Sequence, residues 1–138
     1  MRYLDTSALV KLATAEPETP ALRTHVSERG QVEPFASMLA HAELLRAVQP
    51  AGADAIAAAR RVLSAVHLVD VTREILERAA TLRVPQRLRT LDAIHLATAL
   101  AAEDRLEELV TYDRRLGAAA SSLGIEVSSP GAADEGTT

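Results

Sequence analysis

Four acidic residues stand at positions where the neighbouring residues are mostly apolar. Asp5 ends the short run Tyr-Leu-Asp, and Asp113 ends the run Val-Thr-Tyr-Asp. Glu43 and Asp92 lie within helical patterns that are otherwise largely apolar. An unpaired carboxylate is expensive to bury. Apolar surroundings alone would therefore not predict acids at these four positions.

Acids brought together from these positions would repel one another. Two like charges 4 Å apart cost roughly 1–4 kcal/mol at the dielectrics of a protein surface. A divalent cation removes this conflict, and oxygen ligands with retained water suit Mg²⁺ or Mn²⁺ rather than zinc. Such an ion polarises a phosphoryl oxygen and activates a water. The acids therefore indicate phosphodiester hydrolysis.

Each acid also has a purely structural interpretation. Asp5 and Asp113 stand where a strand passes into a helix, and such residues often cap the helix. Asp92 falls in a first helical turn, where the helix dipole favours an acid. Glu43 would pair with Arg46 if this helix face were solvated. These alternatives stay open at the level of the sequence.

Polar residues next to the acids are candidates for supporting roles. Thr6, Ser7 and Thr111 could bond to the acids or to water around a metal, although capping and turn roles explain them equally well. His95 follows Asp92 by one helical turn. A core histidine with satisfied hydrogen bonds is the favoured interpretation, and contact with substrate or with a carboxylate is the alternative.

Arginines gather beside two of the acids. Arg87 and Arg89 precede Asp92, and Arg114 and Arg115 follow Asp113. Guanidinium groups suit bidentate contacts to phosphate, so these four are candidates for RNA contacts, with a solvated surface as the alternative. If a metal neutralised the four acids, the formal net charge of −4 would become 0. The surface would then no longer repel a polyanion.

Length and composition define the class of protein. The 138 residues suffice for one domain with a core, and 48% apolar with 25% charged residues is an ordinary globular composition. The absence of cysteine excludes disulfides, thiol catalysis and thiolate metal sites. No apolar run reaches the roughly 18 residues of a membrane span. We expect a soluble cytoplasmic protein without membrane contact, with a domain at residues 1–127 and a flexible tail at 128–138.

Strand and helix patterns alternate along the chain. Strands are expected at residues 2–4, 32–36, 67–71, 109–112 and 125–127, with amphipathic helices between them. Pro34 shortens the second of these strands. Ser37, Thr72 and Thr90 are predicted helix caps, and Gly30 and Gly124 are predicted helix ends. This alternation predicts an α/β fold with a central parallel sheet of four to five strands, covered by helices on both faces.

The carboxyl ends of parallel strands form one edge of a sheet, where ligands bind in open α/β folds. Asp5 and Asp113 both follow predicted strands, so we expect them to share one crevice. The signature sequences of P-loop proteins, dinucleotide-binding proteins and serine hydrolases are not present.

Four segments in order resemble the PIN-domain family, specifically the VapC-type ribonuclease toxins of type II toxin–antitoxin systems. They are LDTSALVKL at residues 4–12, AELLRA at 42–47, LDAIHLATA at 91–99 and VTYDRRL at 110–116. The resemblance implies a single three-layer α/β/α PIN-like domain. It also implies that Asp5, Glu43, Asp92 and Asp113 hold Mg²⁺ or Mn²⁺ beside Thr6, Ser7 and Thr111.

The activity implied by this resemblance is endonucleolytic cleavage of structured RNA, such as tRNA or ribosomal RNA. The implied partners are a VapB-type antitoxin, which would block the acidic site, and a second copy of the chain in a homodimer. Arg114, Arg115 and Leu116 stand where some relatives carry a further acid, so a second metal position stays open. Two alternatives remain: a PIN-like module that binds RNA or protein without cleavage, and a metal-dependent enzyme acting on DNA or phosphomonoesters.

Overall fold

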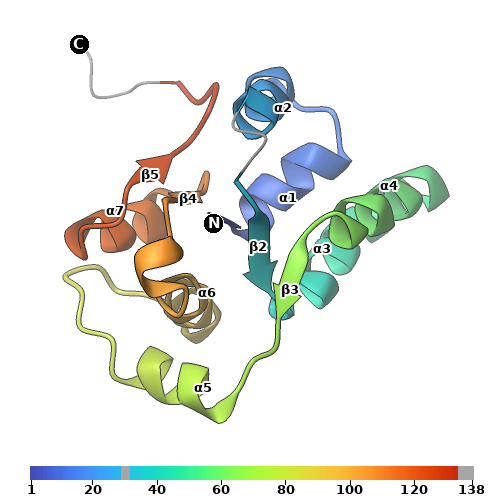
Figure 1. The fold of residues 1–138 in the computed structure, drawn as a ribbon. Coiled ribbons are helices and arrows are strands. Elements are labelled where there is room, and N and C mark those ends of the chain that lie inside the picture. The colour runs from blue at the N-terminus through green and yellow to red at the C-terminus, as the bar shows by residue number, and fades with distance from the viewer. Residues whose placement is uncertain (29–31, 134–138) are drawn as a thin grey trace.

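A five-stranded parallel sheet forms the centre of the protein in a computed structural model, which describes residues 1–28 and 32–133. Figure 1 shows the sheet between two groups of helices. The strand order is β3-β2-β1-β4-β5, and all neighbouring pairs are parallel. The prediction of a parallel sheet with four to five strands is confirmed. The strands are β1 (Arg2–Leu4), β2 (Pro34–Ser37), β3 (His67–Val69), β4 (Glu108–Val110) and β5 (Val127–Ser128).

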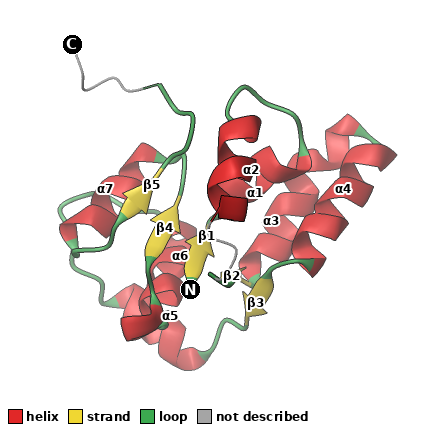
Figure 2. Cartoon of the chain, turned by 45° about the horizontal axis from the view of Figure 1, so that its top comes forward, coloured by secondary structure: helices red, strands yellow, loops and turns green. Residues whose placement is uncertain are grey.

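Helices cover both faces of this sheet, as Figures 1 and 2 show. One face carries α1 (Thr6–Ala13), α2 (Thr19–Glu28), α3 (Leu39–Val48) and α4 (Ala53–Ser64). The other face carries α6 (Thr90–Leu100) and α7 (Arg114–Ser122), and α5 (Arg73–Ala80) packs against α6. Short 3₁₀ helices occupy Gln49–Ala51 and Glu103–Arg105. No helix in the described part of the chain is long and apolar enough to span a membrane.

Alternating side chains of the central strands pack into two hydrophobic cores, one on each face of the sheet. In β1, Tyr3 packs on the α6–α7 face, whereas Leu4 packs on the α1–α4 face. In β4, Leu109 and Val110 divide in the same way. Because successive side chains of a strand point to opposite faces, both layers of helices are held by the same short strands. The strand ends are thereby fixed from both sides.

The predicted burial of the helix after Thr90 is confirmed. Side chains from Ile94 to Ala99 of α6 are all buried. The first turn is different, because Leu91 is 47% exposed and Asp92 is partly exposed. The helix therefore anchors its N-terminal turn, which carries Asp92, against the centre of the domain.

Two of the three predicted N-caps are wrong by one residue. Thr72 caps α5, with its hydroxyl accepting from the backbone N–H of Ile75. Ser37 instead remains in β2, because it pairs with Val69 of β3, and Met38 occupies the cap position of α3. Thr90 is the first residue of α6, because the carbonyl of Arg89 accepts the helical bond from Ala93 N.

Four of the five expected strands also have boundaries that shift by one or two residues. Pro34 is the first residue of β2, a position that tolerates the missing N–H, so the strand starts two residues later than predicted. The last strand starts at Val127 rather than residue 125, because Ile125 N bonds back to Ala120 O at the end of α7. Gly124 has a φ of 82° and ends α7 as predicted. Gly30, the predicted end of α2, lies outside the described residues.

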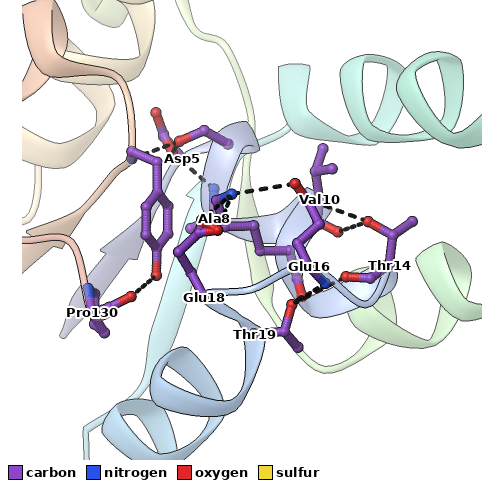
Figure 3. A network of polar contacts seen from close by, with 11 residues as sticks. Asp5, Ala8, Val10, Thr14, Glu16, Glu18, Thr19 and Pro130 are labelled. Atoms are coloured by element: carbon purple, nitrogen blue, oxygen red, sulfur yellow. Dashed lines mark hydrogen bonds and ion pairs between the residues drawn. The ribbon is translucent and has the colours of Figure 1, made fainter. Parts of the chain in front are cut away.

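The chain beyond the predicted domain end stays close to the sheet. Ser128 belongs to β5, and the Ser129 hydroxyl donates to Thr111 O at 2.5 Å. The carbonyl of Pro130, labelled in Figure 3, accepts a 2.7 Å hydrogen bond from the Tyr112 hydroxyl. The flexible tail at 128–138 stays a prediction, and its last five residues lie outside the described part of the chain.

Candidate functional site

Asp5 stands directly after β1 and caps α1. Its Oδ1 accepts hydrogen bonds from the Ser7 hydroxyl at 2.6 Å and from Ala8 N at 3.2 Å, the second of which Figure 3 shows. Its Oδ2 accepts from the Thr111 hydroxyl at 2.7 Å. The side chain is fixed at a buried strand end, so the capping interpretation is correct and does not exclude a role in the site.

Burial makes the charge of Asp5 costly in this structure. Only 5% of the residue is exposed, and this desolvation raises the pKa of the carboxyl above its ordinary value. Hydrogen bonds from Ser7, Thr111 and Ala8 oppose the increase without cancelling it. An aspartate held in this way gains stability from a nearby positive charge.

Asp113 occupies the equivalent position after β4 and caps α7. Its Oδ1 accepts from Arg115 N at 2.9 Å and from Leu116 N at 3.1 Å. The N–H of Asp113 donates to the Thr111 hydroxyl oxygen at 3.0 Å, and the same hydroxyl donates to Asp5. Thr111 therefore connects the two aspartates that follow β1 and β4.

Glu43 is held by two donors on a single oxygen. The Thr6 hydroxyl donates to Oε1 at 2.7 Å, and His95 Nε2 lies 2.6 Å from the same atom. The alternative pair with Arg46 is not formed among the described residues. Burial pushes the pKa of Glu43 up, but the hydrogen bonds from His95 and Thr6 bring it below its ordinary value. Glu43 is therefore held in its ionised form.

Asp92 lies in the first turn of α6, where burial and the charges of other acids raise the pKa of its carboxyl. Burial raises the pKa of its carboxyl, and the neighbouring charge of Asp113 raises it further. The charge of Arg89 acts in the opposite direction, and the charge of Glu43 adds a smaller increase in the pKa of Asp92. Asp92 thus lies close enough to two other acids for their charges to disfavour its own.

One cavity of about 670 Å³ is lined by several of the predicted site residues, which come from three separate elements. It opens over the N-termini of α6 and α7 and beside α3. Arg87 does not line it but accepts a 3.3 Å hydrogen bond on its carbonyl from Arg115 Nη1. Asp5 does not line the cavity, but Thr111 bonds to both Asp5 and Asp113, and Thr6, the residue after Asp5, donates to Glu43. The lining residues are Glu43, Arg89, Thr90, Leu91, Asp92, Asp113, Arg114 and Arg115.

The donor chemistry of these residues fits a hard divalent cation. All four acids offer oxygen, and burial or mutual repulsion raises the pKa of two of them. Within the described residues, no three acidic or histidine side chains stand close enough to hold an ion directly. Mg²⁺ often binds through one or two carboxylates and keeps several waters, so a spread set of acids remains compatible with it.

Sequence reasoning missed one residue of this region. The hydroxyl of Tyr3 lies 2.5 Å from His95 Nδ1, and both side chains are buried. Burial raises the pKa of Tyr3 well above its ordinary value, so the phenol stays protonated. A tyrosine in the middle of the short strand at residues 2–4 was the available signal, because a buried hydroxyl requires a partner.

The fold and the site define an α/β/α protein with an acidic cavity at the carboxyl edge of a parallel sheet. The family model of the PIN domain matches residues 2–121 of this chain. Ribonuclease VapC46 of Mycobacterium tuberculosis is 46% identical over 128 residues, covering 93% of this chain and 96% of the relative. Ribonuclease VapC47 of the same species is 42% identical over 138 residues, covering 96% and 98%. The chain belongs to the PIN-domain family and, within it, to the VapC ribonucleases.

Solved structures share the fold. A toxin–antitoxin complex from Klebsiella pneumoniae contains a chain with a TM-score of 0.72 at 23% identity, covering 94% of this chain and 98% of that one. VapC20 of Mycobacterium tuberculosis, described as a Sarcin-Ricin loop cleaving toxin, gives 0.69 at 17% identity, covering 91% and 96%. VapBC2 from Rickettsia felis, bound to a DNA fragment from its promoter, gives 0.71 at 15% identity, covering 93% and 98%.

Proposed function

We propose that this protein is a metal-dependent endoribonuclease and the toxin of a toxin–antitoxin pair. The observation that carries the proposal is the convergence of Glu43, Asp92 and Asp113 from α3, α6 and α7 on one cavity. Asp5 is joined to this group through Thr111. The membership of the chain in the VapC ribonucleases supports RNA as the substrate.

The acids have distinct parts in this proposal. Asp5, Asp92 and Asp113 would hold Mg²⁺ or Mn²⁺, and Glu43 would bind through water or orient the attacking water. The ion would supply charge neutralisation, polarisation of the phosphoryl oxygen and a more acidic water. Thr6, Ser7 and Thr111 keep the carboxylates in place by donating hydrogen bonds to Glu43 and Asp5.

The arginines around the cavity would bind the RNA backbone. Arg89, Arg114 and Arg115 line the same cavity as the acids, so a phosphate held by them would lie near the carboxylates. Arg87 would contribute from the rim, where its carbonyl holds Arg115. A neighbour in fold that cleaves the Sarcin-Ricin loop supports structured RNA, tRNA or ribosomal RNA, as the substrate class.

A VapB-type antitoxin is the proposed partner. Structures of toxin–antitoxin complexes share this fold, which supports an arrangement in which the partner covers the acidic cavity. A basic side chain of the antitoxin would match the acids there. The proposal also includes a homodimer and a cytoplasmic location, where both the RNA and the partner are found.

The test is a digestion of three substrates side by side. The purified chain is incubated with folded RNA, DNA of the same sequence and a phosphomonoester, with Mg²⁺, Mn²⁺ or EDTA. The matched variants are Asp92→Asn and Asp54→Asn, because Asp92 and Asp54 are both acids in the first turn of a helix and only Asp92 lines the cavity. We expect metal-dependent cleavage of RNA that Asp92→Asn abolishes and Asp54→Asn retains.

The other outcomes identify the rival functions. Cleavage of DNA in preference to RNA would make the protein a DNA nuclease, and release of phosphate from the monoester would make it a phosphatase. Tight binding of RNA or protein without any cleavage, in the presence of either metal, would make it a binding module. Each of these results would overturn the proposal.

A further inference from the structure

A buried chain of hydrogen bonds leads from the sheet to the carboxylate of Glu43. Ser37 N–H donates to the Tyr3 hydroxyl oxygen at 3.1 Å, and this hydroxyl lies 2.5 Å from His95 Nδ1. The other ring nitrogen, Nε2, lies 2.6 Å from Glu43 Oε1. Strands β2 and β1 and helices α6 and α3 each contribute one member. This series of hydrogen bonds thus links the centre of the fold to the acidic cavity.

One set of donor directions satisfies every member of this hydrogen-bond network. The Tyr3 oxygen accepts from the Ser37 N–H, so its own proton is available for His95 Nδ1. A neutral imidazole that accepts at Nδ1 carries its proton on Nε2. Nε2–H then donates to the Glu43 carboxylate, which only accepts when it is ionised. Every donor in the chain finds an acceptor in this arrangement.

The surroundings of the imidazole make this arrangement rigid. Tyr3 is fully buried and His95 is 3% exposed. The two rings meet edge to face, with centroids 5.9 Å apart, and Tyr3 contacts Phe35 in the same manner at 5.1 Å. Neither ring can turn without disturbing the core of the sheet. The nitrogen that faces Glu43 is therefore fixed by packing as well as by hydrogen bonds.

Two fixed donors on one oxygen determine where the Glu43 carboxylate lies. Thr6 and His95 both reach Oε1, and among the described residues no hydrogen bond occupies Oε2. A glutamate has several rotatable bonds, so an unrestrained side chain would lose entropy each time it adopted a reactive position. Restraint through Oε1 removes this cost and leaves Oε2 for a water or an ion.

We infer that His95 and Tyr3 are positioning residues for Glu43: His95 Nε2–H orients the carboxylate, and the Tyr3 hydroxyl selects the imidazole tautomer that can donate. This inference rests on the proposed function, because it assigns Glu43 a part in RNA cleavage. It concerns residues outside the four acids. Neither His95 nor Tyr3 would touch the RNA.

The first test compares turnover with substrate affinity. His95→Leu removes the donor, His95→Gln keeps a donating nitrogen, and Tyr3→Phe removes one oxygen from the core. We expect His95→Leu to lower kcat about 10–100-fold, the usual effect of losing a residue that orients a ligand, while KM stays nearly unchanged. Tyr3→Phe should lower kcat by a smaller factor than His95→Leu does. His95→Gln should keep most of the kcat that His95→Leu loses. The control His67→Gln, at an exposed histidine of β3, should match the wild type.

A double-mutant cycle separates positioning from general destabilisation. If His95 acts through Glu43, His95→Leu lowers kcat in the wild type but has no further effect in Glu43→Ala. Equal losses in both backgrounds would overturn the inference and assign His95 a structural role. Wild-type kcat in Tyr3→Phe and His95→Leu would overturn it as well, while the proposed RNA cleavage would stand.

A second readout needs neither RNA nor metal. The ¹⁵N spectrum of the His95 imidazole should show a neutral ring with the proton on Nε2, and Tyr3→Phe should shift it toward a mixture of tautomers. A proton on Nδ1 alone in the wild type would overturn the inference. If the wild type cleaves no RNA but shows the Nε2–H tautomer, the proposed function fails while the orientation of Glu43 by His95 is supported.

Discussion

The hydroxyl of Thr111 donates to Oδ2 of Asp5 at 2.7 Å, although the two residues are 106 positions apart in the sequence. The contact exists because β1 and β4 are parallel neighbours that end at the same edge of the sheet. The same hydroxyl oxygen accepts from Asp113 N at 3.0 Å. A single threonine therefore sets the relation between the two aspartates that follow these strands.

Replacing Thr111 by valine should weaken both the fold and the site. Valine has nearly the same shape but leaves Asp5 Oδ2 and Asp113 N–H without their partner. Loss of one partner of a buried hydrogen bond costs about 1–3 kcal/mol. We expect Thr111→Val to lower the free energy of unfolding by roughly this amount, measured by urea denaturation, and to slow RNA cleavage. Thr111→Ser keeps the hydroxyl, so a serine variant as defective as the valine variant would contradict this account.

Asp5→Asn should separate stability from activity. Burial raises the pKa of Asp5, so its ionised form destabilises the metal-free fold, and this cost grows as the pH rises. Asparagine is uncharged and caps a helix as well as aspartate does, but its amide nitrogen cannot accept the hydrogen bond that Thr111 donates to Oδ2. We expect the melting temperature of the variant, relative to that of the metal-free wild type, to rise between about pH 4 and pH 7, because only the wild type gains the costly charge. RNA cleavage should fall by about 10²-fold or more, because the variant loses a charged oxygen ligand.

Added Mg²⁺ provides the internal control for this variant. It should raise the melting temperature of the wild type, because an ion that binds only the folded state stabilises it. It should have less effect on Asp5→Asn. A difference in melting temperature between the two metal-free proteins that does not change with pH would show that the ionised carboxylate does not destabilise the fold, contrary to our assignment.

Arg89→Ala should weaken RNA binding in a salt-dependent manner. Arg89 lines the cavity and acts on the charge of Asp92. Each phosphate contact to a single strand contributes about −0.7 to the slope of log affinity against log salt. We expect the slope to become shallower by about this amount for RNA bound to the non-cleaving Asp92→Asn protein, measured by fluorescence anisotropy. Arg61→Ala, at an exposed arginine of α4, should leave the slope unchanged. An equal change in that variant would show that the slope depends only on the net charge of the protein and not on a contact made by Arg89.

The strand-to-helix acids were the most predictable part of the site. Asp5 and Asp113 are local features, because each follows a short strand and precedes a helix whose N–H groups it accepts. The sequence order of such junctions in a parallel sheet places them at one edge. These two aspartates could therefore be assigned to one edge of the sheet before any contact was known.

Contacts that depend on packing between distant elements were beyond sequence reasoning. Nothing near Glu43 in the sequence indicates that His95 takes the place of Arg46 as its partner, since that choice depends on how α3 and α6 approach the sheet. Tyr3 was missed because its role needs the register of β1 with β2, which brings its hydroxyl to Ser37 N. The boundary at Ser37 was displaced by an interaction of the same kind, the pairing of Ser37 with Val69 of β3.

Glu108 lies at the edge of the sheet opposite the acidic cavity, and it should make the free energy of unfolding depend on pH. It is 1% exposed and bonds to Arg2 Nε at 2.6 Å, to His25 and to Ser128. Burial pushes the pKa of Glu108 up, but the bonds from Ser128, His25 and Arg2 bring it below its ordinary value of 4.5. A lowered pKa in the folded state stabilises the fold above that pH and ceases to do so as the pH falls through the folded value.

The measurement is the free energy of unfolding between pH 7 and pH 3, for the wild type and Glu108→Gln. We expect the variant to lose about 3–5 kcal/mol at pH 7, because Arg2 keeps a buried charge without its partner. The difference between the two proteins should shrink below about pH 4.5, close to the ordinary pKa of glutamate. Glu77→Gln, at an exposed carboxylate of α5, should follow the wild type. A constant difference across the whole range would contradict the assignment to Glu108.

Gly131 should hold the segment after β5 against α2. Its φ is 78°, and a Cβ there would lie 2.9 Å from Ala21 Cβ and 3.3 Å from Glu18 Cα. Gly124 has a similar φ of 82° with no atom within 4 Å of a Cβ, so Gly124→Ala measures the backbone strain alone. That strain is about 1–2 kcal/mol. We expect Gly131→Ala to lose more stability than Gly124→Ala and to speed amide hydrogen exchange in α2, because the segment must move away from Ala21. Equal losses and unchanged exchange would show that the segment is not packed on α2 in solution.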